Sequence, residues 1–365
     1  MVLHVLSDDK FTNYVINQFS DSRMNSDIVV IPSGGEHKIT KRDNVRIINY
    51  PSKEFSDLLH QLKKYSGVVL HGLFWPYMED IIKNAPQYLK IAWYFWGGEI
   101  YSHKNIMMSF LAPVTKILYK LHSYKKNKDY TKNWQLPIEL YKRIDYCLTA
   151  ELEEYEFAKK YTESDMDFVW YTCYSLEETI GELINSRIKG ENVLFCNSAA
   201  VETNIFDATL RLSMPSYRKH LKNKEVIVPL SYGYKWIKNL MLKIGPIFFY
   251  KFKPIVEFLP REEYNKLMLN CSTLILPYYS PAGQGNIITA LWLGMRVYLS
   301  NKSIALTFFK RIGVTIFSIE DDFKLYGTSP ISNEVVEHNR NILVNIYSKA
   351  KVDECCKYLI RILEN

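Results

Sequence analysis

The sequence predicts an α/β protein made of two doubly wound domains, each with a parallel sheet. The chain has 365 residues, more than one compact core usually fills. Short apolar runs alternate with helix-length amphipathic segments, which is typical of βαβ units. The alternation restarts near residue 190, after a polar segment that ends in Lys189-Gly190. A hydrophobic content of 47% and a charged content of 23% fit a folded globular chain rather than a disordered one.

Two series of short apolar runs supply the predicted strands. The first series is Val2–Leu6, Asp27–Ile31, Val45–Ile48, Val68–His71, Ile91–Phe95, Tyr146–Thr149 and Phe168–Thr172. The second is Asn192–Asn197, Glu225–Pro229, Ile255–Phe258, Thr273–Pro277, Val297–Ser300 and Thr315–Ser318. Helical patterns between them include Phe55–Tyr65, Glu151–Tyr161, Arg261–Asn270 and Ile287–Leu293.

Three structural regions follow from these series. We expect an N-terminal Rossmann-like domain over residues 1–185 and a second one over residues 186–340. Asn333–Glu364 is predicted to be helical throughout, and its last part, residues 341–365, is expected to pack back on the N-terminal domain. The two sheets should face each other across a cleft. In doubly wound sheets ligands bind at the carboxyl ends of the strands, so candidate site residues are sought in the loops that follow strands.

Charge and cysteine content narrow the class of protein. The net charge of +7 suits an anionic partner such as a nucleotide, a lipid headgroup or a nucleic acid. Nucleic acid is the weakest of these, because the lysines cluster in one segment and no nucleic-acid motif is present. The six cysteines form no C-x-x-C pair, which indicates reduced core residues rather than a zinc site or disulfides. The chain starts directly in a strand without a signal-peptide pattern and has no apolar run of about 18–20 residues, so a soluble or peripheral protein is expected.

A glycine-containing loop in the second half is the most informative motif. Within Thr273–Ser300 a buried strand ends at Pro277, and the loop Ser280–Gly285 leads into a helix that starts at about Asn286. Glycines allow a ligand to approach the backbone closely. The amides of Gly285, Asn286 and Ile287 would lie at the helix start, where the helix dipole favours a diphosphate. The alternative is an ordinary strand-to-helix loop in which glycine only ends one element.

The segment before this loop carries a resemblance to a known fold family. Ile255–Met268 reads IVEFLPREEYNKLM, and the order strand, LP-x-E-x-Y, helix, strand, glycine loop, helix resembles the C-terminal half of GT-B glycosyltransferases. The resemblance implies that the backbone before the LP turn, at Val256 and Glu257, holds the nucleobase. It also implies that Gly283, Gln284, Gly285, Asn286 and Ile287 hold the diphosphate.

One departure from the GT-B pattern concerns the reaction. Retaining GT-B enzymes usually carry an E-x7-E pair, and the matching positions here are Pro281 and Thr289, neither of which is acidic. An inverting enzyme is therefore expected. No D-x-D motif follows a strand, since Asp165-Met166-Asp167 precedes one, so neither a metal nor another cofactor is predicted.

A narrower resemblance rests on several post-strand motifs. They are AWYFWGGEIY at Ala92–Tyr101, His4–Asp8, His71–Phe74, Val193–Asn197 with Glu202, and Val228–Gly233. Together they resemble the 4-acetamido-4,6-dideoxygalactosyltransferases of glycosyltransferase family 56, over most of the chain from His4 to about Asp321. That family moves an amino sugar from a dTDP donor to the undecaprenyl-diphosphate disaccharide of enterobacterial common antigen. The resemblance implies inversion, no metal, a dTDP- or UDP-linked deoxy-amino sugar, and a polyprenyl-diphosphate-linked saccharide acceptor.

Inverting transfer needs a base and a stabilised leaving group. Glu99 is our first choice for the base, because it follows a strand beside two glycines and aromatic rings that can raise its pKa. The alternative is a structural carboxylate. Asp8 is second and could instead cap a helix, and His71 is third and could instead be a core residue. The donor site is predicted to include further post-strand side chains: Asn197, Ser198, Ser231, Tyr232 and Tyr278.

A basic amphipathic segment suggests membrane contact. Residues Lys104–Lys132 contain seven lysines and one acid, Asp129, with apolar residues interleaved. Such a segment suits anionic headgroups, which it would contact through Lys116, Lys120, Lys125 and Lys126. The alternative is a solvated helix on the N-terminal domain. The membrane interpretation, together with the lipid-linked acceptor, predicts a peripheral protein on the cytoplasmic face of the bacterial inner membrane.

Two other functions fit parts of the pattern. A nucleotide-sugar epimerase on the same fold would need its own acid and base in the second domain and no membrane helix. A non-catalytic protein that binds a nucleotide sugar would keep its function when Glu99 is replaced by glutamine. These alternatives stay open on sequence grounds.

Overall fold

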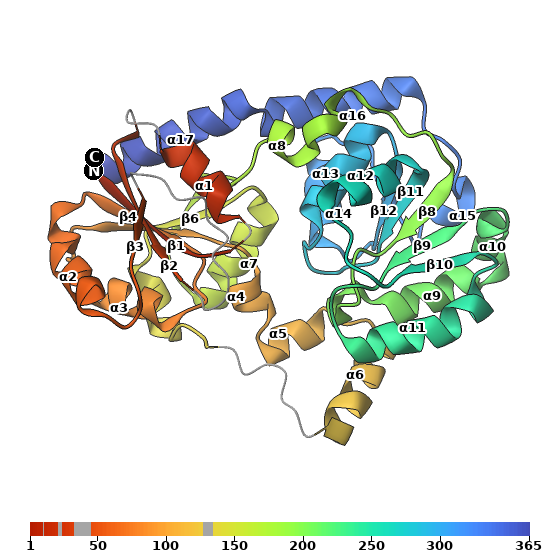
Figure 1. Cartoon of the computed structure of the whole chain (residues 1–365), viewed down its shortest axis with the longest axis horizontal. Coiled ribbons are helices and arrows are strands. Elements are labelled where there is room, and N and C mark those ends of the chain that lie inside the picture. The colour runs from red at the N-terminus through yellow and green to blue at the C-terminus, as the bar shows by residue number, and fades with distance from the viewer. Residues whose placement is uncertain (10, 21–23, 33–44, 127–133) are drawn as a thin grey trace. The chain divides into compact units, whose positions relative to one another are not determined.

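The computed structural model describes residues 1–9, 11–20, 24–32, 45–126 and 134–365, without the side chains of residues 124–126 and 261 (Figure 1). The described chain forms two compact units. Unit 1 contains Met1–Ser102, Lys132–Ser175 and Tyr347–Asn365, and unit 2 contains His103–Thr131 and Leu176–Ile346. Each unit has one parallel sheet with helices packed against it, so the predicted α/β class with two Rossmann-like sheets is confirmed.

Unit 1 is organised around a seven-stranded sheet. Its order is β3-β2-β1-β4-β5-β6-β7, and every pairing is parallel. The strands are β1 (Val2–Ser7), β2 (Ser26–Ile31), β3 (Val45–Ile47), β4 (Gly67–His71), β5 (Lys90–Tyr94), β6 (Tyr146–Thr149) and β7 (Asp167–Trp170). The strand order reverses between β1 and β4, and doubly wound sheets bind ligands at such a point.

Helices cover the sheet of unit 1. They are α1 (Thr12–Phe19), α2 (Lys53–Gln61), α3 (Pro76–Asn84), α4 (Gly98–Tyr101), α7 (Leu152–Thr162) and α17 (Lys349–Glu364), with 3-10 turns at Leu62–Lys64 and Ile138–Arg143. Helix α17 packs against β1, β4 and α1, and Phe19 and Leu359 belong to one buried cluster (Figure 1). The predicted return of the C-terminal helix to the N-terminal sheet is therefore confirmed.

Unit 2 is organised around a six-stranded parallel sheet. Its order is β10-β9-β8-β11-β12-β13. The strands are β8 (Asn192–Phe195), β9 (Val226–Pro229), β10 (Phe252–Ile255), β11 (Cys271–Leu276), β12 (Arg296–Leu299) and β13 (Phe317–Ser318). The order reverses between β8 and β11, so this unit also has a switch point.

Two helical layers cover the sheet of unit 2. The helices are α5 (Lys104–Ser109), α6 (Pro113–Lys126), α8 (Leu176–Ile180), α9 (Ile205–Ser213), α10 (Pro215–Arg218), α11 (Lys235–Phe248), α12 (Arg261–Leu269), α13 (Gln284–Leu293), α14 (Ile304–Arg311), α15 (Phe323–Tyr326) and α16 (Asn333–Tyr347). Short 3-10 turns lie at Gly181–Asn185, Val201–Thr203 and Lys219–Leu221. Helix α9 packs between α6 and α11, and α13 packs against β11 and β12 (Figure 1).

The structure differs from the predicted boundaries at three places. Residues 103–131, expected in the domain over residues 1–185, belong to unit 2, because Met107, Leu111 and Tyr119 are buried in the core formed with α9 and α11. The predicted continuous C-terminal helix is interrupted at Ser348, whose extended backbone separates α16 from α17. The strand predicted at Ile255–Phe258 lies earlier, because Pro254 is tolerated in the edge strand β10.

No helix in the part of the chain that the structure describes is both long and apolar enough to cross a membrane.

Candidate active site

Loops after three neighbouring strands of unit 1 meet at its switch point. Asp8 and Asp9 follow β1, His71 ends β4, and the segment Trp96–Glu99 follows β5. Asp9, His71 and Trp96 line one small cavity of about 10 Å³, so these loops converge at the same edge of the sheet. The sequence-predicted base candidates therefore lie in one region of unit 1.

Glu99 is held by three N–H donors. Its Oε1 accepts hydrogen bonds from Trp93 Nε1 at 3.0 Å, from the Trp96 amide at 3.2 Å and from the Leu73 amide at 3.4 Å. Its Oε2 is buried and accepts no hydrogen bond from any residue that the structure describes. The side chain is only 5% exposed. Burial raises the pKa of Glu99 from 4.5 to about 7, although the three hydrogen bonds oppose this change.

The two glycines before Glu99 allow this arrangement. Gly97 has a positive φ of 86°, and a Cβ at this position would lie 2.8 Å from the ring of Tyr101. A Cβ at Gly98 would lie 3.1 Å from the ring of Phe74. Because both positions lack a side chain, the loop turns tightly enough for the Trp96 amide to reach the Glu99 carboxylate.

A second carboxyl group, that of the half-buried Glu154, lies near Glu99. It comes from α7, and its Oε2 accepts a hydrogen bond from Thr149 Oγ1 at 2.9 Å. Its Oε1 lies 3.6 Å from the point where a Cβ on Gly97 would be. Burial of the carboxyl group, together with the negative charge of Glu99, raises the pKa of Glu154 to about 8. Two neighbouring carboxyl groups with raised pKa values are typical of acid–base sites.

Sequence reasoning missed Glu154. The available signal was the position of Thr149 at the end of a predicted strand, with Glu154 in the first turn of the next predicted helix. That position suggests an ordinary acidic residue that complements the helix dipole. The proximity of Glu154 to Glu99 depends on the pairing of β5 with β6, which no local pattern contains.

His71 and Asp8 occupy different environments from Glu99. His71 Nε2 lies 3.2 Å from His4 Nδ1, and burial lowers the pKa of His71 to about 3, so the ring is neutral near pH 7. The helix-capping alternative for Asp8 is not seen, because the N-cap residue of α1 is Phe11 and no side chain caps this helix. The neighbouring Asp9 accepts a hydrogen bond from the Phe11 amide at 2.7 Å through its Oδ1. Asp8 itself is buried, at 6% exposure. Between Glu99 and His71, Glu99 has the pKa closer to neutral pH.

The switch point of unit 2 brings together four predicted donor-site residues. Tyr278 follows β11 and donates its phenol hydrogen to Asn197 Oδ1 in the loop after β8. The Tyr278 oxygen also lies 3.4 Å from Ser198 Oγ. A Cβ at Gly283 would lie 3.3 Å from Asn197 Nδ2. The glycine loop therefore lies close to the loop after β8 that carries Asn197. Burial raises the pKa of Tyr278, which keeps its hydroxyl protonated as a donor.

The glycine loop begins helix α13. Gly283 is the N-cap residue, with a positive φ of 84°, and a Cβ added to Gly285 would meet no atom within 4 Å. This open space lies at the amino end of a ten-residue helix, where the first amides lack acceptors within the helix. The Ile287 amide, in contrast, donates to Gly283 O at 3.0 Å, and its side chain is fully buried. We therefore remove Ile287 from the proposed anion-binding set.

The remaining predicted donor-site residues follow β9 and β10. Ser231 and Glu257 are exposed, as are Tyr232 at 74% and Val256 at 40%. The loop after β9 is tied to the loop after β8 by the Ala199 amide, which donates to Tyr232 O at 2.7 Å. Because β10, β9 and β8 are neighbours, these exposed groups line the same carboxyl edge as Asn197.

No three His, Cys, Asp or Glu side chains among the described residues gather as a metal site would require.

Comparison with known proteins shows the fold. No family model and no curated protein matches the sequence. Solved structures that resemble it include the sucrose-phosphate synthase of Thermosynechococcus elongatus, with a TM-score of 0.62 and 10% identity over 100% of this chain and 99% of that one. The UDP-forming α,α-trehalose-phosphate synthase of Burkholderia xenovorans, in complex with glucose-6-phosphate, has a TM-score of 0.57 and 9% identity over 100% of both chains.

A third similar structure is the lipopolysaccharide outer core galactosyltransferase WaaB. Its TM-score is 0.60, with 11% identity over 99% of both chains. These similarities extend over the full length of the chain at very low identity. The fold of this protein is the GT-B fold of glycosyltransferases.

Proposed function

We propose that this protein is an inverting, metal-independent glycosyltransferase that moves a sugar from a nucleoside diphosphate to an acceptor hydroxyl. The observation that carries the proposal is the open amino end of α13 at the switch point of unit 2, within a GT-B fold. One of the similar structures is described as UDP-forming and another as a galactosyltransferase. A nucleotide-sugar donor on unit 2 is consistent with both descriptions.

The donor diphosphate would bind at the glycine loop. The amides of Gly285 and Asn286 lie in the first turn of α13, where the helix dipole attracts negative charge. Asn197 and Tyr278 would complete the pocket around the diphosphate and the sugar, since they are joined by a hydrogen bond beside Gly283. The nucleoside would extend along the exposed loops after β9 and β10, which include Tyr232, Val256 and Glu257.

Glu99 would act as the base. Its unpartnered Oε2 takes the proton of the acceptor hydroxyl while the acceptor oxygen attacks the anomeric carbon. The bond from that carbon to the diphosphate oxygen breaks, and the nucleoside diphosphate leaves with its bonding electrons. The amides of α13 would stabilise its developing charge. A pKa of about 7 suits this step, because a useful fraction of Glu99 is ionised while the carboxylate still binds a proton well.

The substrate class follows from the narrower resemblance to glycosyltransferase family 56. We propose a dTDP- or UDP-linked deoxy-amino sugar as donor and a polyprenyl-diphosphate-linked saccharide as acceptor. The two positions that match the E-x7-E pair of retaining enzymes are Pro281 and Thr289. Because neither is acidic, an inverting reaction is favoured. Thr289 instead donates its hydroxyl to Gly285 O at 2.8 Å, within its own helix.

A lipid-linked acceptor would require contact with a membrane, for which α6 offers a surface. Ile117 is 59% exposed and Leu121 is 55% exposed, although both are apolar. Lys116 and Lys120 lie beside them on the same helix, which contains no acidic residue. The other two predicted contacts, Lys125 and Lys126, belong to α6 with side chains outside the described residues. We propose that α6 lies on an anionic membrane surface at the cytoplasmic face.

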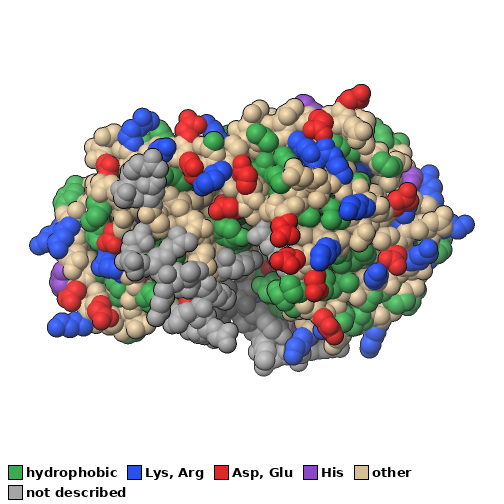
Figure 2. Space-filling model, turned by 45° about the horizontal axis from the view of Figure 1, so that its top comes forward, with side chains coloured by type: hydrophobic (Ala, Val, Ile, Leu, Met, Phe, Trp, Pro, Cys, Tyr) green, Lys and Arg blue, Asp and Glu red, His purple; other side chains and the backbone are tan. Residues whose placement is uncertain are grey.

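Helix α11 adds to this basic surface. It carries Lys235, Lys238 and Lys243 and no acid, and Ile247 near its end is 68% exposed. On the face of the molecule drawn in Figure 2, by contrast, acidic and basic side chains are interspersed. Clusters of lysine with exposed apolar residues are typical of peripheral membrane proteins.

Nucleotide binding tests the donor site first. The thermal stability of the full chain is measured with dTDP, UDP, GDP and their sugar conjugates, and we expect dTDP or UDP compounds to raise Tm. No change in Tm with any of them would contradict the proposal.

A glutamine variant tests the base. Glu99→Gln should abolish transfer and keep the Tm increase with the donor, whereas exposed Glu156→Gln on α7 should change neither. Near-normal turnover of Glu99→Gln would exclude Glu99 as the base. Retained nucleotide binding without any transfer by the wild type would favour a non-catalytic binding protein.

A further inference from the structure

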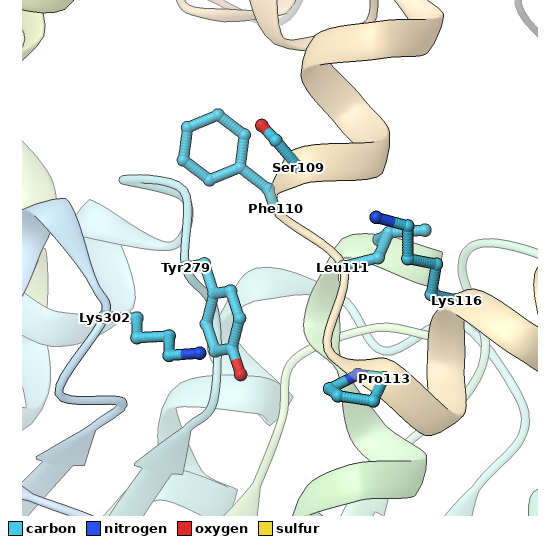
Figure 3. Close-up of a pocket in the computed structure, with 7 residues that line it drawn as sticks. All are labelled: Ser109, Phe110, Leu111, Pro113, Lys116, Tyr279 and Lys302. Atoms are coloured by element: carbon cyan, nitrogen blue, oxygen red, sulfur yellow. The ribbon is translucent and has the colours of Figure 1, made fainter.

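A second pocket in unit 2 lies outside the proposed donor site. Its volume is about 390 Å³, and Figure 3 shows its two walls. One wall is the junction between α5 and α6, with Phe110, Leu111 and Lys116, and the other comes from the loops after β11 and β12, with Tyr279 and Lys302. A pocket of this size accommodates a small organic ligand.

The chemistry of the pocket favours an anion. Lys116 and Lys302 enter it from the two opposite walls (Figure 3). Lys302 Nζ lies 5.2 Å from the centre of the Tyr279 ring. Neither lysine forms an ion pair with a residue in the described ranges. Two uncompensated ammonium groups beside a phenol suit a ligand with phosphate oxygens.

Nearby acids are already engaged with backbone amides. The carboxylate of Asp207 accepts hydrogen bonds from the Val114 and Thr115 amides, each at 2.8 Å, at the amino end of α6. Glu320 Oε2 accepts one from the Asn301 amide at 2.8 Å. Both acids therefore hold the walls of the pocket in place, and neither forms an ion pair with Lys116 or Lys302 among the described residues.

The α5–α6 wall is also fixed by one buried residue. Asn204 has a positive φ of 51° and is 1% exposed. Its Oδ1 accepts a hydrogen bond from the Ala112 amide at 2.7 Å, and its Nδ2 donates to Phe110 O at 3.0 Å. A wall held by four side-chain-to-backbone hydrogen bonds, two from Asn204 and two from Asp207, is preorganised for a ligand.

An apolar strip leads out of this pocket along α6. Pro113, which lines the pocket, is followed by Ile117 and Leu121 at intervals of four residues, so the three share one face of the helix. All three are exposed. Lys116 and Lys120 form a parallel row beside them. A ligand with phosphate at one end and a long hydrocarbon chain would match both features.

We propose that this pocket binds the diphosphate of a polyprenyl-linked acceptor, with the first isoprene units along Pro113, Ile117 and Leu121. The proposal rests on the glycosyltransferase function above, because it assigns a site to the acceptor of that reaction. The diphosphate would contact Lys116 and Lys302, and the Tyr279 hydroxyl would donate a further hydrogen bond. A water-soluble sugar phosphate shares the phosphate chemistry but has no group for the apolar strip.

Binding of farnesyl diphosphate to the full chain tests this assignment. Titration calorimetry is carried out with saturating dTDP, which occupies the donor site, and with farnesol, pyrophosphate and glucose-6-phosphate as comparison ligands. Farnesyl diphosphate should bind in the presence of dTDP and more tightly than any comparison ligand. Lys116→Ala and Lys302→Ala should each weaken its binding about 10-fold or more, as expected for a hydrogen bond to a charged group.

Matched variants separate the two parts of the pocket. Ile117→Ser and Leu121→Ser should weaken farnesyl diphosphate and leave pyrophosphate unchanged. Lys310→Ala, an exposed lysine on α14, should leave both unchanged. The Tm increase with dTDP confirms that each variant is folded and reports on the donor site independently.

Several results would overturn the assignment. The first two are that farnesyl diphosphate does not bind, or that dTDP displaces it. The others are that neither Lys116→Ala nor Lys302→Ala weakens its binding, or that glucose-6-phosphate binds more tightly and depends on these lysines. If dTDP still raises Tm in such a case, only the acceptor pocket is wrong. If no nucleotide binds and no sugar is transferred, the proposed function itself fails.

Discussion

Replacing Glu99 by glutamine should stabilise the protein at alkaline pH. The Glu99 pKa is raised by burial from 4.5 in the unfolded chain to about 7 in the folded protein, so the folded state binds the proton more tightly. The stability that this group contributes is therefore present below about pH 4.5 and is lost as the pH rises to about 7. A tenfold change in proton affinity corresponds to about 1.4 kcal/mol, so the pKa change from 4.5 to about 7 costs roughly 3 kcal/mol above pH 7.

Glutamine avoids this cost because it carries no charge. Its amide oxygen can accept the same hydrogen bonds from Trp93, Trp96 and Leu73 that Glu99 Oε1 accepts. The amide nitrogen would occupy the position of Oε2, which has no hydrogen-bond partner among the described residues. The free energy of unfolding of Glu99→Gln, relative to the wild type, should therefore rise by about 2 kcal/mol between pH 5 and pH 8.

Urea unfolding at pH 5, 6, 7 and 8 measures this difference. Glu156→Gln on the exposed side of α7 is the control, and its stability difference from the wild type should not depend on pH in the same way. A constant difference for Glu99→Gln across this range would show that Glu99 is ionised normally in the folded protein. A raised pKa would then no longer support Glu99 as the base.

Further predictions concern the two sites and the wall of the second pocket. The kcat/KM of the wild type should rise with pH through about 7, as Glu99 ionises. The Glu154→Gln variant should show the same rise, because Glu154 is still protonated near pH 7 in the wild type. Gly283→Ala should lower the unfolding free energy by about 1–2 kcal/mol, because its φ is positive, whereas Gly285→Ala should keep Tm and weaken nucleotide binding. Asp207→Ala should lower the unfolding free energy by about 1–2 kcal/mol, by uncapping α6, and leave nucleotide binding intact.

Much of the fold could be predicted because its signals are local. Apart from Ile255–Phe258, the predicted apolar runs became parallel strands, since buried strands between helices have to be apolar on both faces. The glycine loop was also readable, because Gly283 has the positive φ that favours glycine and α13 starts directly after it. These local signals placed the predicted donor residues Asn197, Tyr278 and Gly283 at one switch point.

Features that depend on distant contacts could not be predicted. Residues 103–131 lie within the sequence range predicted for the first domain, but Asn204 and Asp207 bind the backbone at Ala112 and Val114 to unit 2. The raised pKa of Glu154 depends on burial and on the charge of Glu99, which follows the neighbouring strand β5. His71 was proposed from its place at a strand end, and its pairing with His4 follows from the register of β1 with β4. Local sequence contains none of this information.

Hydrogen exchange with and without a nucleotide sugar tests the central claim most directly. A bound dTDP- or UDP-sugar should slow exchange in the loops after β8, β10 and β11, and most strongly at the first amides of α13 around Gly285 and Asn286. Protection confined to other regions, or no protection at a concentration that raises Tm, would contradict a nucleotide-sugar site on unit 2.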